Sequence, residues 1–278
     1  TDRTVKGLHQ PLRLAGLAYG PAEPTQWGAK ERAVDFFRQM KHPKSRLPEK
    51  AFDLPRFWER IIRRVYGPVD RNGSRQVKTV FILMPRGGRK TTVGAGLSLL
   101  HTVGFERTEG GLALAAAAAE DQATIAFEEA VAIVKASPWL ARRTRLKEST
   151  FELVHPKTGS EFRAIPAKGD IQLGKTPTFV LADELIAWPS RALWKALRTG
   201  LVKVPNSLMI VITQAGRGQN NLAFELYEYA KKVQSGAIED HGFLPIIFET
   251  DPGADWRDEK IWHFVNPGLE LGFPDLAG

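Results

Sequence analysis

The sequence contains no cysteine among its 278 residues. This absence excludes disulfide bonds, zinc sites built on thiolates, iron–sulfur clusters and thiol nucleophiles. Six histidines are present, but none has the His-x-x-x-His or His-x-x-Glu-His spacing of a metal-binding helix, so a transition-metal enzyme is not expected. Any catalysis must therefore depend on oxygen groups and on nitrogen groups such as the lysine amine.

Long hydrophobic runs are also missing. No apolar segment approaches the roughly 18 residues that a membrane-spanning helix needs. The first residues, Thr1-Asp2-Arg3-Thr4, lack the charged and then apolar order of a signal peptide. Because 43% of the residues are hydrophobic and 25% are charged, the composition is typical of a globular protein with a full core. We expect a soluble, intracellular protein of one or two domains with no membrane partner.

Positive charge dominates the chain but is distributed unevenly. The formal net charge is +8, from 39 basic and 31 acidic residues. Residues 220–278 hold 11 acidic and 4 basic side chains and have a net charge of −7, so the first 219 residues carry +15. A charge of this size suits a polyanionic partner such as DNA, RNA or a nucleotide. A solvated basic surface would give the same pattern.

Short apolar runs alternate with helical patterns from residue 78 onward, which indicates an α/β fold whose sheet is built from crossover connections. Two of the runs, 80–84 and 208–212, are apolar on both faces, as central strands of a covered parallel sheet must be. Between two later runs, the loop 157–160 predicts a hairpin. The expected strands are 79–84, 112–116, 151–155, 161–165, 178–182, 208–213 and 243–248, and the expected helices are 29–41, 55–66, 90–103, 120–136, 190–199 and 220–234.

The segment 80–92 has the layout of a phosphate-binding loop. A buried strand leads into Pro85-Arg86-Gly87-Gly88-Arg89, and Lys90-Thr91-Thr92 then opens a helix. Backbone N–H groups from Gly87 to Lys90 would point at phosphate oxygens, helped by the positive end of the helix dipole. Lys90 would reach the β and γ phosphates, and the Thr91 hydroxyl would complete the ligand shell of Mg²⁺.

The match to the usual G-x-x-x-x-G-K-[ST] pattern is incomplete, because Met84 and Arg89 occupy the two glycine positions. A surface turn with two glycines and exposed cations would give the same local sequence. The loop therefore needs support from elsewhere in the chain before it predicts nucleotide binding.

That support comes from the apolar strand 178–182, which ends in Asp183-Glu184. Ligands of open α/β folds bind at the carboxyl edge of the sheet, where these two carboxylates would lie. Asp183 would hold Mg²⁺ directly or through water, and Glu184 would orient and deprotonate the attacking water. Two acids after a strand are common in themselves, but together with the Lys-Thr loop they predict a nucleotide hydrolase.

A third strand, 208–213, ends in Thr213-Gln214-Ala215-Gly216. A polar side chain at this point can sense whether a γ-phosphate is present and pass that state to a neighbouring element. A strand-to-loop turn that uses Gly216 would explain the same residues.

Taken in order, these motifs resemble the large terminase subunit of tailed bacteriophages, specifically its N-terminal packaging ATPase, over about residues 30–270. The phosphate loop is similar to a variant form in which an early arginine, here Arg86, accompanies the lysine and threonine. Segment 181–188 resembles the family's Asp-Glu strand, and segment 212–216 resembles its coupling motif. Segment 119–123 is similar to a helix start of the family, and segment 251–268 resembles the stretch that leads to the nuclease.

The resemblance implies an α/β P-loop NTPase fold of the ASCE or RecA-like type, with a mostly parallel central sheet flanked by helices and an N-terminal helical arm. It divides the chain into an arm and helix at 1–50, an ATPase core at 51–250 and an acidic linker at 251–278. The linker would lead to a nuclease domain that is not present in this segment, so nuclease activity is not expected from it.

The resemblance also implies a function. The protein would hydrolyse ATP with Mg²⁺ and pump double-stranded DNA into a procapsid in the host cell cytoplasm. It would act as a homo-oligomeric ring of five subunits docked on the portal protein, with the small terminase subunit as a further partner. The implied roles are catalysis by Glu184, Lys90 and Arg86, cofactor binding by Pro85, Arg86, Gly87, Gly88, Arg89, Lys90, Thr91 and Thr92, metal binding by Thr91 and Asp183, and coupling by Thr213 and Gln214.

In such a ring an arginine from the neighbouring subunit would neutralise charge that develops on the γ-phosphoryl group. Arg142, Arg143 and Arg145 are candidates, in a stretch at 135–147 with five basic and no acidic residues. The same cluster would also suit DNA phosphates or a solvated helix end, and Arg86 would be an alternative within its own subunit.

One departure from the family lies upstream of the loop, where a glutamine in a Leu-Pro-x-x-Gln context helps to recognise adenine. Here Leu54-Pro55-Arg56-Phe57-Trp58 offers Trp58 at about that place, so stacking would replace hydrogen bonding. Two other functions remain open. One is another P-loop nucleic-acid motor, such as a helicase, and the other is a hydrolysis-deficient module that binds DNA or the portal, as Arg89 in a glycine position would suggest.

Overall fold

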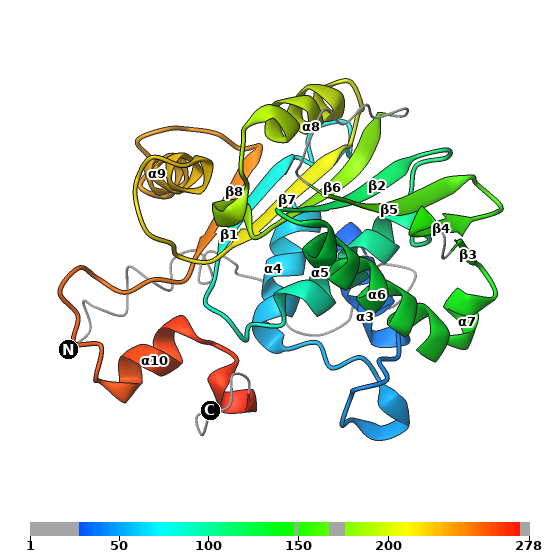
Figure 1. The fold of residues 1–278 in the computed structure, drawn as a ribbon, viewed down its shortest axis with the longest axis horizontal. Coiled ribbons are helices and arrows are strands. Elements are labelled where there is room, and N and C mark those ends of the chain that lie inside the picture. The colour runs from blue at the N-terminus through cyan, green and yellow to red at the C-terminus, as the bar shows by residue number, and fades with distance from the viewer. Residues whose placement is uncertain (1–27, 148–149, 167–175, 273–278) are drawn as a thin grey trace.

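A computed structural model describes residues 28–147, 150–166 and 176–272. Its centre is an eight-stranded sheet with the order β3-β4-β5-β2-β6-β7-β1-β8 (Figure 1). Neighbouring strands from β5 to β8 in this order are parallel, whereas β3, β4 and β5 pair antiparallel at one edge. The expected α/β architecture with a mostly parallel sheet is therefore confirmed.

The strands and helices follow the hydrophobic pattern closely, and each predicted element agrees with an observed one to within three residues at either end. The strands are β1 (Thr79–Leu83), β2 (Leu112–Ala117), β3 (Arg145–Lys147), β4 (Glu152–His155), β5 (Ser160–Pro166), β6 (Pro177–Asp183), β7 (Leu208–Thr213) and β8 (Phe243–Ile247). The α-helices are α3 (Ala29–Gln39), α4 (Arg56–Tyr66), α5 (Lys90–Thr102), α6 (Glu120–Ala136), α7 (Pro138–Ala141), α8 (Ala192–Val202), α9 (Leu222–Gln234) and α10 (Glu259–Val265).

Three short elements were not predicted from the sequence. Strand β3 has three residues and no buried side chain, and it forms by pairing with β4 rather than through its own pattern. Helix α7 has four residues. Helix α10 lies within the stretch expected to be an acidic linker, where the Asp258 carboxylate caps its first turn by accepting the Lys260 N–H.

Helices cover both faces of the sheet and create two hydrophobic clusters. Helices α8 and α9 lie on one face, and α3, α4, α5 and α6 lie on the other (Figure 1). Successive residues of β1 alternate between the clusters, since Val80 and Ile82 pack toward α5 and Phe81 packs toward α8 and α9. None of the helices in the described ranges is long and apolar enough to span a bilayer.

Helix α3, which lies in the expected segment 1–50, packs into the main hydrophobic cluster. Phe37 is fully buried and its ring meets Phe52 edge to face at 5.3 Å. Arg63 of α4, 1% exposed, donates two hydrogen bonds to Glu31 of α3 at 2.9 and 3.0 Å. Apolar packing and a buried ion pair therefore join α3 to the rest, while residues 1–27 lie outside the described part.

We expect Phe37→Ala to lower the free energy of unfolding by about 3–5 kcal/mol, because it empties a fully buried site between α3 and α5. Leu47→Ala is a control in the same 1–50 segment. Its side chain is 42% exposed, so the change should cost less than about 0.5 kcal/mol. Urea unfolding followed by circular dichroism measures both, and equal stability of Phe37→Ala and the parent would show that α3 is not part of the core.

Candidate active site

The loop between β1 and α5 is shaped by the methionine that replaces its first glycine. The side chain of Met84 is buried under the loop, and the backbone N–H of Met84 donates to the Thr213 carbonyl at 3.0 Å. A Cβ atom at Gly88 would come within 2.2 Å of the Met84 sulfur. Gly87 has a φ of 82°, in the region that favours glycine. Both remaining glycines are thus required by the geometry of the loop.

Arg89 occupies the second glycine position and takes up the conformation expected of glycine. Its φ is 55°, in the left-handed region, which costs about 1–2 kcal/mol for a residue with a Cβ. Its guanidinium Nη1 lies 3.0 Å from both the Asp53 carbonyl oxygen and one Asp53 carboxylate oxygen. The side chain is directed away from the loop interior, and the contacts to Asp53 offset part of the backbone strain.

Trp58, which the sequence suggests as a stacking partner for the base, is fully buried in this structure. The indole Nε1 donates to the Gly88 carbonyl oxygen at 2.8 Å, so the side chain supports the loop from beneath. A buried indole leaves no exposed ring face for a nucleotide. In this chain Trp58 is a structural partner of the loop.

Lys90 and the acid pair at 183 and 184 meet at the carboxyl edge of the sheet. The Lys90 ammonium donates to Glu184 Oε1 at 3.2 Å and to the Met84 carbonyl at 3.3 Å, and it is 8% exposed. Strand β7 separates β1 and β6, so the two motifs converge across one intervening strand. The predicted proximity of the lysine and the acids is therefore found in the fold.

A cleft of about 630 Å³ opens beside this ion pair. Its lining residues are Arg86, Gly87, Arg89, Lys90, Thr91, Thr92, Gln122, Glu184, Ile186, Ala187 and Gln214. Two residues of the predicted phosphate loop do not line the cleft, because Pro85 faces a neighbouring pocket and Gly88 is buried. The cleft gathers cationic and hydroxyl side chains at the N-terminus of α5, an arrangement that favours anions.

Asp183 and Glu184 have different surroundings although they are adjacent. Burial, and then the negative charge of Glu184, raise the pKa of Asp183 to about 6. Asp183 Oδ1 accepts the Glu184 N–H at 3.0 Å. Glu184 has a φ of 47°, and its Oε2 is buried without a hydrogen-bond partner among the described residues. An unsatisfied carboxylate oxygen next to an open cleft is suited to bind a water molecule.

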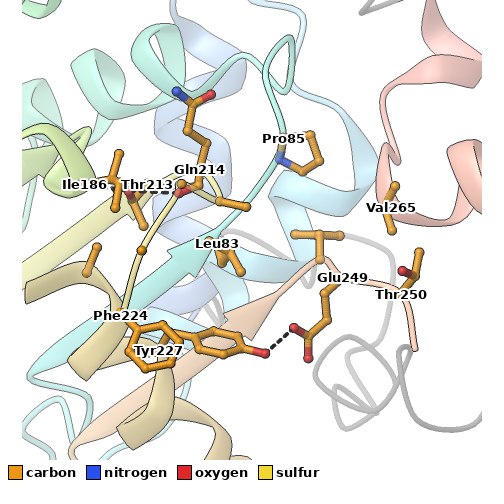
Figure 2. Close-up of a pocket in the computed structure, with 15 residues that line it drawn as sticks. Leu83, Pro85, Ile186, Thr213, Gln214, Phe224, Tyr227, Glu249, Thr250 and Val265 are labelled. Carbon is orange, nitrogen blue, oxygen red and sulfur yellow. Dashed lines mark hydrogen bonds between the residues drawn. The ribbon is translucent and has the colours of Figure 1, made fainter. Parts of the chain in front are cut away.

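The last residue of β7 and the residue after it contact the phosphate loop and the turn that follows the acid pair. Gln214 Oε1 accepts a hydrogen bond from Arg86 Nε at 3.0 Å, and Thr213 Oγ1 accepts the Ile186 N–H at 3.2 Å. Figure 2 shows Thr213, Gln214 and Ile186 at one side of an adjoining apolar pocket of about 410 Å³, with Pro85 opposite. The predicted coupling residues thus connect the loop to the turn that follows Glu184.

The three candidate arginines Arg142, Arg143 and Arg145 lie away from the cleft. Arg142 and Arg143 lie between α7 and β3, and Arg145 is the first residue of β3, at the sheet edge opposite to β8. The Arg143 guanidinium stacks over the Trp139 ring at 5.4 Å. None of them lines the cleft of its own chain.

Four residues near the cleft were not singled out in the sequence as site residues: Gln122, Asp53, Glu129 and His42. Gln122 lines the cleft, and Asp53 holds Arg89. Glu129 accepts hydrogen bonds from Thr92 and His42. The only signal for Glu129 is a charged residue between the buried Ala126 and Ala130 on α6, and its partners lie 37 and 87 positions away.

The donor set fits a magnesium ion that is held mainly by phosphate and water. Within the described ranges no group of three or more His, Asp or Glu side chains could hold a metal by itself. Mg²⁺ keeps several waters and binds through one or two carboxylates together with substrate phosphates. The carboxylate of Asp183 and the hydroxyl of Thr91 would supply the limited set of protein ligands that such an ion needs.

The family model described as "Terminase large subunit, ATPase domain" matches residues 56–232. The chain is 27% identical over 183 residues to the large terminase subunit of Enterobacteria phage HK97, which is 65% of this chain and 35% of that protein. The crystal structure of the HK97 large terminase superposes with a TM-score of 0.76 at 24% identity, over 87% of this chain and 48% of that one. The chain therefore spans less than half of the length of these relatives, and the structural match shows the shared fold.

A short stretch of 34 residues is 62% identical to the phenylalanine–tRNA ligase beta subunit of Cupriavidus pinatubonensis. This stretch is 12% of the chain and 4% of that protein. It carries no conclusion about the cleft.

We expect Asp183→Asn to stabilise the ligand-free protein at neutral pH. Because the folded pKa of about 6 exceeds the ordinary 3.8, the protonated carboxyl contributes stability that is complete below pH 3.8 and lost as the pH rises to about 6. Asparagine removes the charge and keeps the oxygen that accepts the Glu184 N–H. The variant should gain about 1–3 kcal/mol at pH 7.5 and much less at pH 4.

Urea unfolding at the two pH values measures this difference. Asp251→Asn, a change at an exposed carboxylate, should shift the free energy of unfolding by less than about 0.5 kcal/mol at either pH. A variant Asp183→Asn that is less stable than the parent at pH 7.5 would contradict the electrostatic analysis.

Proposed function

The chain belongs to the family of the terminase large subunit ATPase domain, and we propose that it hydrolyses ATP to move double-stranded DNA into a viral procapsid. One observation carries the proposal: the Lys90 ammonium and the Glu184 carboxylate form an ion pair in the lining of one cleft, and the partly buried Asp183 is the next residue in the chain. A cation, a hydroxyl and two carboxylates at the carboxyl edge of a parallel sheet are the groups that phosphoryl transfer requires.

In this mechanism the loop binds the triphosphate and the acids act on the water. Lys90 exchanges its contact with Glu184 for the β and γ phosphates, since both are anions within reach of a flexible ammonium. Release of that contact leaves Glu184 with two carboxylate oxygens to orient and deprotonate the attacking water. Thr91 and Asp183 would hold Mg²⁺, which neutralises charge on the phosphates.

Arg86, Gln214 and Thr213 report the state of the cleft. Arg86 lines the cleft and donates to Gln214, so a γ-phosphate that attracts Arg86 competes with this hydrogen bond. Thr213 is bonded to the turn that follows Glu184, so a change at Gln214 reaches the catalytic acid through one adjacent residue. This pair of contacts supports the coupling role.

The assembly is proposed on the family alone. A homo-oligomeric ring of five subunits would dock on the portal protein and procapsid in the host cell cytoplasm, with the small terminase subunit as a partner. Arg142, Arg143 and Arg145 lie away from their own cleft, as an arginine acting on a neighbouring subunit must. No nuclease activity is proposed for this segment.

The alternative of a hydrolysis-deficient module rested on Arg89 in a glycine position. Arg89 adopts the left-handed conformation, and Asp53 draws its side chain out of the loop. The position thus keeps the backbone shape that a glycine would give, and this observation favours the hydrolase.

We expect Lys90→Ala and Glu184→Gln both to abolish ATP hydrolysis, with a loss of at least about a hundredfold. Glu184→Gln should still bind ATP, because it removes the base and leaves the phosphate site intact, whereas Lys90→Ala should bind poorly. Phosphate release, measured with and without DNA and at several subunit concentrations, tests the rate.

Glu109→Gln, a change at an exposed carboxylate far from the cleft lining, provides the matched control and should hydrolyse ATP like the parent. Unaltered turnover in purified Glu184→Gln would refute the assigned roles. A low rate in dilute protein is expected where the arginine comes from a neighbouring subunit, so the rate should rise with concentration.

DNA binding should be independent of sequence and weakened strongly by salt. The first 219 residues carry +15, and contacts to phosphates release counterions in proportion to their number. We expect the affinity for a random duplex to fall at least about tenfold between 50 and 200 mM salt. Electrophoretic mobility shifts measure it, and affinity that does not change with salt would exclude backbone recognition.

A further inference from the structure

Three elements distant in the sequence meet beside the first turn of α5. Thr92 Oγ1 donates to Glu129 Oε1 of α6 at 2.6 Å, and His42 Nε2 lies 2.9 Å from the same oxygen. Lys44 Nζ is 3.9 Å from the other carboxylate oxygen. Glu129 therefore joins the helix that follows the phosphate loop to α6 and to the segment before α4.

The direction of the histidine contact follows from its second nitrogen. The Lys44 backbone N–H donates to His42 Nδ1 at 3.3 Å, so Nδ1 accepts and Nε2 carries the proton in the neutral ring. Nε2–H then donates to Glu129. The His42 backbone is fixed in turn, because its N–H donates to the Lys50 carbonyl at 2.8 Å.

Glu129 is held as an ion with little exposure. Its side chain is 15% exposed, and the hydrogen bond from His42 is the largest cause that lowers its pKa, to about 2, with a further contribution from Thr92. Hydrogen bonds to an ionised acceptor are roughly twice as strong as neutral ones. Thr92 is thus held by one of the stronger side-chain hydrogen bonds near the cleft.

We propose that Glu129 is a positioning residue of the nucleotide site, and that it fixes the first turn of α5 through Thr92. This inference rests on the proposed function, because it concerns the affinity of the cleft for phosphate. Thr92 lines the cleft, and Glu129 does not. Glu129 acts on the ligand only through Thr92.

The loop of this chain has a particular need for such support. Two glycine positions hold Met84 and Arg89, and the left-handed backbone of Arg89 stores strain at the residue where α5 begins. Asp53 restrains Arg89, Trp58 restrains Gly88, and Glu129 restrains Thr92, each from outside the loop. Of the three restraining residues, Glu129 is the one whose partner follows Lys90 in the sequence and lines the cleft. That partner is Thr92.

A cavity of about 250 Å³ adjoins the cleft. Its lining suggests how two alternative roles of Glu129 can be distinguished. The cavity shares Arg89 and Thr92 with the cleft and is also lined by His42 and Glu129. If Glu129 positions the loop, its loss weakens binding of any triphosphate. If it contacts the nucleoside directly, its loss weakens ATP but not inorganic tripolyphosphate.

The experiment compares the 278-residue parent with Thr92→Val, Thr92→Ser, Glu129→Ala and the control Glu128→Gln, an exposed carboxylate adjacent on α6. Dissociation constants for ATP and for tripolyphosphate are measured by titration calorimetry with Mg²⁺, and kcat and KM by phosphate release. Thr92→Val and Glu129→Ala should raise both dissociation constants and the KM about tenfold, in line with the loss of one charged hydrogen bond, and change kcat less than about threefold. Thr92→Ser should recover most of the affinity, and Glu128→Gln should match the parent.

Three results would overturn the proposal: parent-like affinity of Thr92→Val, a loss confined to ATP, or a loss in kcat alone. Thr92→Val keeps the shape of the side chain and remains informative if Glu129→Ala does not fold. Failure of the proposed function is distinguishable, because the parent itself would then bind neither ATP nor tripolyphosphate.

Discussion

The site depends on one ion pair, between the Lys90 ammonium and the Glu184 carboxylate. An ammonium that is 8% exposed needs a partner charge, because removing an unpaired ion from water costs several kcal/mol. Only the strand order brings that partner close. Strands β6, β7 and β1 are adjacent and parallel, so their carboxyl ends share one edge although Lys90 and Glu184 are 94 residues apart. The ion pair holds the Lys90 and Glu184 side chains together in the lining of the cleft.

Met84 and Arg89 replace the two usual glycines of the loop, and contacts from other elements stabilise the loop conformation in their place. The Met84 side chain packs beneath the loop, so that only glycine fits at position 88. The strain at Arg89 is offset through Asp53. In the usual motif the glycines adopt these conformations at little cost, whereas here contacts from α4, α6 and the segment 40–53 take over. A degenerate motif is therefore compatible with a formed site when the surrounding core supplies the restraint.

Much of the fold was predictable because central parallel strands are long apolar runs and the helices between them are regular. The convergence of Lys90 with the acid pair followed from the rule that strand ends share an edge. The roles of Trp58 and Glu129 were not predictable in this way, since each depends on a contact with a residue far along the chain. Trp58 has the residue type of a stacking partner, and only its burial shows that it supports the loop. The packing of α3 against α4 was likewise not predictable from the pattern of α3 alone, because its buried partners, such as Arg63, lie in another helix.

The position of β7 between β1 and β6 explains why its end lies near both motifs. Because the three strands are adjacent and parallel, β7 ends between the phosphate loop and the acids. Gln214 contacts the loop through Arg86. Thr213 contacts Ile186 in the turn after Glu184, and Figure 2 shows these two residues side by side. The two residues are adjacent in the chain, and a shift of one backbone changes both contacts together. The end of β7 thus joins the loop to the turn after Glu184 through two adjacent residues, and no longer pathway through the protein is needed to connect them.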